Sequence, residues 1–117
     1  MIPSYTVPLT AEARWELFGA WCELNPALLR SIERHAVDMW RAGHKRISAK
    51  YLVEWARYEV PIESKGIPFV DNSGKVRFYR ICNTDTPALG RWLKMRHPDM
   101  PVYTKPSVLD DDAPCTS

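Results

Sequence analysis

Basic side chains are concentrated in one short stretch of this 117-residue chain, residues 41–60. Lys and Arg donate hydrogen bonds to phosphate oxygens and to the acceptor edges of bases, so such a cluster suits the binding of a polyanion. Between positions 41 and 57 the only acidic residue is Glu54. The cations in that window are Arg41, Lys45, Arg46, Lys50 and Arg57.

The same stretch encodes the turn and the helix that would hold these cations. Gly43 follows a run with helical periodicity and suits the left-handed residue that closes a helix. Ser48 can cap a new helix, because its hydroxyl accepts a hydrogen bond from a free backbone N–H. Pro61 ends that helix. The sequence therefore predicts a helix-turn-helix unit whose second helix spans residues 49–60.

The helix predicted over residues 49–60 has one apolar stripe and two other faces. The stripe is formed by Ala49, Leu52, Val53 and Ala56. The charged face carries Lys50, Glu54 and Arg57, and the aromatic flank carries Tyr51, Trp55 and Tyr58. A DNA recognition helix needs this division, because one face is buried while the other presents donors to the groove. An ordinary amphipathic helix with a solvated polar face fits the pattern equally well.

The remaining elements indicate a mainly α-helical fold with a small β-hairpin. Helices are predicted over about residues 11–24 and 26–42, ahead of the one at 49–60. Two short apolar runs on either side of the turn residues 71–74 predict the hairpin. A cap-and-proline signal at residues 85–87 starts a last helix that ends near His97. Three helices, a hairpin and a further helix follow the order of a winged helix, with Lys75 and Arg77 where the wing would carry charge.

We expect one winged-helix-like domain over residues 10–98. Residues 1–9 hold two prolines and are predicted to form an extended N-terminal arm. Residues 99–117 contain several prolines and end in an acidic run, which is typical of a flexible tail. This tail is therefore expected to be dispensable for folding.

The uneven distribution of charge is more informative than the formal net charge of +2. The window 75–97 holds six cations against Asp85. Two basic windows between acidic ends suggest one positive face that attracts polyanions. The alternative is that the acidic ends fold back and neutralise this face.

Several functional classes lack support in the sequence. The cysteines and histidines share no ligand spacing, so we expect no metal site. Asp85, His35 and His97 could act as acid or base groups, but nothing places them together, and we expect neither an enzyme nor a cofactor. No apolar run is long enough to cross a bilayer, and the first residues do not form a signal peptide. We therefore expect a cytoplasmic protein.

Three segments resemble, in the same order, a family of short phage and prophage proteins. They are Asn25-Pro26, ISAKYLVEWARYE at 47–59 and FYRICNTDTPALGRWLKMRHPDMP at 78–101. The resemblance covers roughly residues 16–101 and includes the basic turn before Ser48. The family is mainly uncharacterised, with a presumed winged-helix fold, so the resemblance implies a phage origin and the cytoplasm of a bacterial host. This chain departs from the family pattern at NTDT, residues 83–86, where paired asparagines are usual.

Two functions from different classes fit these observations. The first is a winged-helix protein that binds double-stranded DNA, such as a transcriptional regulator. Its contacts would be Lys45, Arg46, Lys50, Tyr51 and Arg57, with Lys75 and Arg77 on the wing. The second is a phage accessory protein that binds a host or phage protein through aromatic and Arg side chains, the types that dominate interface hot spots. The oligomeric state stays open: a dimer is compatible with either function, although no heptad run is present.

The predicted core gives a first test of the helix assignments. Its members should include Trp15, Phe18, Ile32, Leu52, Ala56 and Leu93. Leu52→Ala should lower the free energy of unfolding by about 2–5 kcal/mol, because a buried leucine leaves a cavity when truncated. Chemical denaturation measures this loss. A loss below about 0.5 kcal/mol, as for ordinary surface substitutions, would mean that the helix at 49–60 faces another way.

Overall fold

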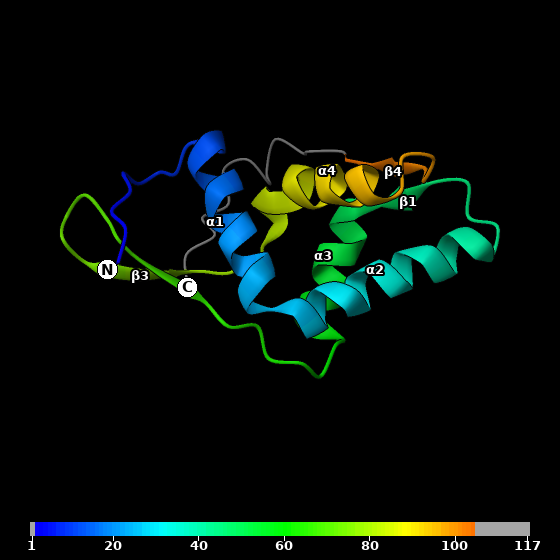
Figure 1. The fold of residues 1–117 in the computed structure, drawn as a ribbon, viewed down its shortest axis with the longest axis horizontal. Helices are drawn as coiled ribbons and strands as arrows, with labels where there is room; N and C mark the ends of the chain where they lie inside the picture. Colours follow the sequence, from blue (N-terminus) through cyan, green and yellow to red (C-terminus); the bar gives the residue numbers. More distant parts are fainter. Residues whose placement is uncertain (1, 105–117) are drawn as a thin grey trace.

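The computed structural model describes residues 2–104, in which helices predominate (Figure 1). The four α-helices are α1 (Ala11–Leu24), α2 (Pro26–Arg41), α3 (Ala49–Tyr58) and α4 (Thr86–Arg96). A 3-10 turn, η1 (Asn83–Asp85), leads directly into α4. The predicted mainly helical fold with a small hairpin is confirmed.

The boundaries of the first two helices follow from local signals. Thr10 caps α1, since its hydroxyl accepts a hydrogen bond from the Ala13 N–H. Pro26 begins α2, where a missing N–H costs nothing. The Asn25 side chain does not cap α2, however. It is buried, donates to the Trp21 and Lys65 carbonyls and accepts from the Lys65 N–H, which fixes the loop after α3.

The core lies where α1, α2, α3 and α4 meet. Five of the six residues predicted to form it are buried, namely Phe18, Ile32, Leu52, Ala56 and Leu93. Trp15 is only half-buried, because its indole lies at the edge of the core beneath the Arg91 guanidinium. The apolar stripe of α3 is buried along its whole length, which confirms the predicted orientation of this helix.

The hairpin is formed by β2 (Ile67–Val70) and β3 (Val76–Tyr79), which pair antiparallel. Its turn contains Gly74 at φ 83°, a conformation that suits glycine. The segment predicted as an N-terminal arm adds to the other edge of β2. The Tyr5 N–H donates to the Val70 carbonyl, and the Val70 N–H donates to the Pro3 carbonyl.

A second, parallel pair joins β1 (Ile47–Ser48) to β4 (Val102–Tyr103). Met100 and Val102 are buried, so the flexible tail expected from residue 99 does not begin there. Residues 105–117 of that predicted tail lie outside the described residues. The sequence could not reveal this pairing, because two-residue strands show no periodicity and their partner lies over fifty positions away.

The hairpin and the turn between α2 and β1 lie at opposite ends of the molecule (Figure 1). The longest dimension of the chain is 48 Å, and β2 packs against α1. The hairpin turn, where Lys75 and Arg77 were expected to act as a wing, therefore does not lie beside the turn between α2 and β1. Within residues 2–104, no helix has the length and apolar character needed to cross a membrane.

The pairing of β1 with β4 predicts that residues 102–104 contribute to the stability of the fold. A chain that stops at Pro101 should melt roughly 5 °C or more below one that stops at Thr104, because it loses the buried Val102 side chain. Thermal unfolding followed by circular dichroism compares the two. Equal melting temperatures would show that residues 102–104 contribute nothing to stability.

Candidate nucleic-acid interface

The turn that carries the basic residues is closed by a Schellman motif at the end of α2. The Gly43 N–H donates to the Trp40 carbonyl, and the His44 N–H donates to the Met39 carbonyl. Gly43 has φ 97°, where a side chain would be strained, so its predicted role is confirmed. This closure holds the following residues in one direction, away from α2.

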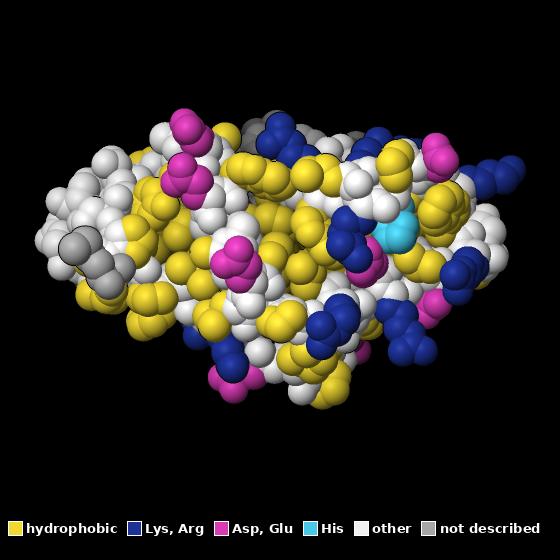
Figure 2. Space-filling view, viewed as in Figure 1, with side chains coloured by type: hydrophobic (Ala, Val, Ile, Leu, Met, Phe, Trp, Pro, Cys, Tyr) yellow, Lys and Arg dark blue, Asp and Glu magenta, His cyan; other side chains and the backbone are white. Residues whose placement is uncertain are grey.

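Three of the cations around this turn are exposed: Arg41, Lys45 and Arg46. The Arg46 guanidinium lies 4.3 Å from the centre of the Tyr103 ring on β4, which positions it. Arg41 and Lys45 form no ion pair with any residue in 2–104. Figure 2 shows Lys and Arg side chains gathered mainly over the half of this face that holds α2 and α4. We call Arg41, Lys45 and Arg46 the basic turn.

Helix α3 begins immediately after the basic turn. Ser48 caps it, since its hydroxyl accepts a hydrogen bond from the Tyr51 N–H at 3.1 Å, as predicted. Lys50 is partly buried, whereas Arg57 is exposed and lies over the Tyr58 ring. Of the predicted contacts on α3, Arg57 and Tyr51 are thus exposed, whereas Lys50 is only partly accessible; Lys50 and Tyr51 lie in the first turn, and Arg57 lies in the last turn.

An aromatic cluster joins α3 to α2, and sequence reasoning missed its central member, His35. The His35 ring stacks on Trp55, with centroids 4.1 Å apart and planes 6° apart. Its Nε2 lies 3.0 Å from the Tyr51 hydroxyl. Tyr51 remains 42% exposed. The only available signal was that His35 is adjacent to buried Ala36, at the margin of the apolar stripe of α2.

The two hairpin cations differ from each other. Lys75 is exposed, but Arg77 is half-buried and its Nε lies 2.6 Å from the buried Asp71 carboxylate. Hydrogen bonds from Ser73 and Arg77 hold the pKa of Asp71 below its usual range. Arg77 therefore closes the hairpin turn and is not presented as a wing contact. Arg77 and Tyr79 share the more buried face of β3, whereas Val76 and Phe78 are exposed.

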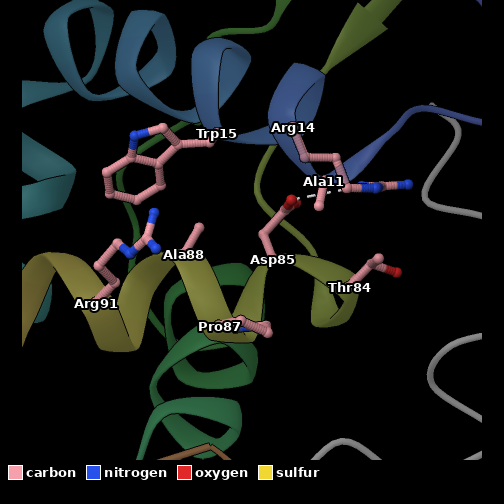
Figure 3. Close-up of a pocket in the computed structure, with 8 residues that line it drawn as sticks. All are labelled: Ala11, Arg14, Trp15, Thr84, Asp85, Pro87, Ala88 and Arg91. Carbon is pink, nitrogen blue, oxygen red and sulfur yellow. Dashed lines mark hydrogen bonds and ion pairs between the residues drawn. The ribbon is translucent and has the colours of Figure 1, made fainter.

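A second charged site lies between α1 and the start of α4 (Figure 3). It is a cavity of about 260 Å³ lined by Arg14, Asp85 and Arg91, among others. The Asp85 carboxylate is buried, accepts a hydrogen bond from the Cys82 N–H and pairs with Arg14 Nη1 at 3.4 Å. Although Asp85 precedes α4, its side chain does not cap that helix, contrary to one predicted role.

The three groups considered as acids or bases occupy separate places. Asp85 pairs with Arg14, His35 belongs to the aromatic cluster, and His97 bonds to Glu33 at 2.8 Å. Among the described residues, no three His, Cys, Asp or Glu side chains are grouped to hold a metal ion. Comparisons with protein-family models, curated proteins and solved structures found no match to this chain.

Burial raises the pKa of Asp85 from 3.8 to about 6, although the Arg14 guanidinium opposes the shift. The native state therefore binds a proton more tightly than the unfolded chain, and this stabilisation is lost as pH rises from about 4 to 6. The Asp85→Asn variant has no carboxyl group that could titrate at this position. Its stability relative to the wild type should rise by up to about 3 kcal/mol across that window.

Urea denaturation at several pH values measures this difference. Asp38→Asn, which removes an exposed carboxylate from α2, controls for the loss of one charge. A difference between Asp85→Asn and wild type that stays constant with pH would contradict the raised pKa of Asp85.

Proposed function

We propose that this chain is a small DNA-binding protein that contacts double-stranded DNA through the basic turn and the outer surface of α3. The observation that carries the proposal is the basic turn itself. Its cations are exposed at the end of α2 and on the turn that follows, and Arg41 and Lys45 have no carboxylate partner among residues 2–104. Such uncompensated charge attracts the phosphate backbone.

The two parts of this surface would have different tasks. The basic turn would contact phosphates, which contributes affinity and orientation but no sequence information. Helix α3 would supply the base contacts, since Arg57, Lys50 and the Tyr51 hydroxyl lie on its outer surface. Arg and Lys pair with the acceptor edge of guanine, which favours readout in the major groove.

The order of elements supports a winged-helix-like relationship, and the resemblance to phage proteins supports a regulator in a bacterial host. The position of the hairpin does not support a winged-helix arrangement, because the hairpin lies at the opposite end of the long axis from the basic turn (Figure 1). We therefore exclude Lys75 and Arg77 from the proposed DNA surface. The proposal involves no catalytic group, cofactor or metal, and it places the protein in the cytoplasm.

A second candidate function is the binding of a host or phage protein, and the aromatic cluster favours it. Tyr58 is 73% exposed next to Trp55 and Tyr51, and Arg57 lies over its ring. Exposed tyrosine and arginine side chains on rigid helices are frequent anchors of protein interfaces. The cluster adjoins the proposed DNA surface, so substitutions must separate the two functions.

Binding to DNA should depend on salt and on the basic turn. Lys45→Ala should weaken binding to every duplex and flatten the slope of log K against log salt by about 0.9, as for one phosphate contact. Arg57→Ala should instead reduce discrimination between sequences by about 1–3 kcal/mol. Fluorescence anisotropy with random and genomic duplexes at several salt concentrations measures both effects.

Lys75→Ala is the matched control, because it removes an exposed lysine from the far end of the molecule. It should leave affinity and slope unchanged. A loss equal to that of Lys45→Ala would mean that the hairpin acts as a wing after all. Absence of salt-dependent binding by the wild type would reject DNA binding and leave the protein-partner function.

A further inference from the structure

The cavity between α1 and α4 has features that the proposed DNA surface does not use (Figure 3). Two arginines reach it from two helices, Arg14 from α1 and Arg91 from α4. Asp85 lies between them at the base of α4. Two guanidinium groups against a single carboxylate leave the site with a positive charge.

The arginines retain donors, whereas the carboxylate has few acceptor positions left. One Asp85 oxygen faces Arg14 Nη1, and the other accepts from the Cys82 N–H. A guanidinium carries five N–H donors, so one contact leaves most of those on Arg14 unused. Arg91 stacks 4.9 Å from the Trp15 ring centre and forms no ion pair with a described residue. The site is therefore suited to an anion and not to a cation.

The rest of the lining is apolar and limits the size of the ligand. Ala11, Pro87 and Ala88 contribute carbon atoms to the wall. The Trp15 ring stacks with Phe18 and lies beneath the Arg91 guanidinium. A ligand in the cavity can therefore contact the edge of this ring but not a free face. A volume of about 260 Å³ is smaller than most sites for drug-sized molecules, which begin at roughly 300 Å³.

We infer that this cavity binds a small organic carboxylate, whose anionic group pairs with Arg91 while its apolar body lies against Ala88. Arg14 is paired with Asp85 and points away from Arg91 (Figure 3), so it offsets the charge of Asp85 and does not share the ligand. A planar guanidinium matches a carboxylate with two parallel hydrogen bonds. An inorganic phosphate would satisfy Arg91 but leave the apolar wall uncovered. This site is separate from the basic turn, so it can be tested independently of DNA binding.

The test uses benzoate as the carboxylate, followed by amide and arginine side-chain chemical shifts of the full chain. Benzoate should shift the signals of Ala88 and of the Arg91 Nε group. Benzyl alcohol, which has the same ring without the charge, and inorganic phosphate should each bind at least about tenfold more weakly. Equal binding of benzyl alcohol, or shifts confined to other residues, would overturn the carboxylate site.

Arg91→Ala tests the charge without disturbing the core, because Arg91 is exposed. Benzoate affinity should fall at least about tenfold. Lys94→Ala is the matched control on the same helix, since Lys94 is exposed and does not line the cavity. Unchanged affinity in Arg91→Ala, or phosphate binding as tight as benzoate in the wild type, would refute the inference.

Discussion

Buried backbone at the start of α3 must be hydrogen-bonded, and the segment after α4 supplies the partners. The Ile47 N–H donates to the Pro101 carbonyl at 2.9 Å, and both Ile47 and Val102 are buried. An unpaired buried N–H would be costly, so β1 and β4 are held together. Gly90 permits the close packing of α4 on this pair, since a Cβ there would lie 2.6 Å from Thr104 Cγ2. The direction of the basic turn and of α3 depends on this arrangement.

Ion pairs neutralise three arginines outside the basic turn. Asp71 pairs with Arg77 inside the hairpin, Asp85 pairs with Arg14 between η1 and α1, and Glu33 on α2 pairs with Arg96 on α4. Two of these pairs neutralise a cation of the basic window 75–97, namely Arg77 and Arg96. The relevant quantity for polyanion binding is therefore the charge that remains unpaired at one place, which the formal net charge of +2 does not reveal.

The two proposed sites lie on different parts of the fold and rely on different chemistry. The basic turn is convex and exposed, which suits an extended partner such as a duplex. The cavity beside Arg14 and Arg91 is small and mostly apolar, which suits a compact ligand. Helix α4 contributes to both regions, because its first turns line the cavity and its body packs on β4, the strand that carries Tyr103.

Local signals in the sequence were sufficient to predict the helices, the cap at Ser48, the closure at Gly43 and the buried stripe of α3. These depend on residues within a few positions of one another, where hydrogen bonding and periodicity act directly. The tertiary structure alone decided that β4 pairs with β1, that Arg77 faces Asp71 and that the hairpin lies against α1, at the far end from the basic turn. It also brought Arg14 and Arg91 to one cavity. Apart from the Asp71–Arg77 pair within the hairpin, these features join residues distant in the chain, and packing of the whole core, not local preference, selects them.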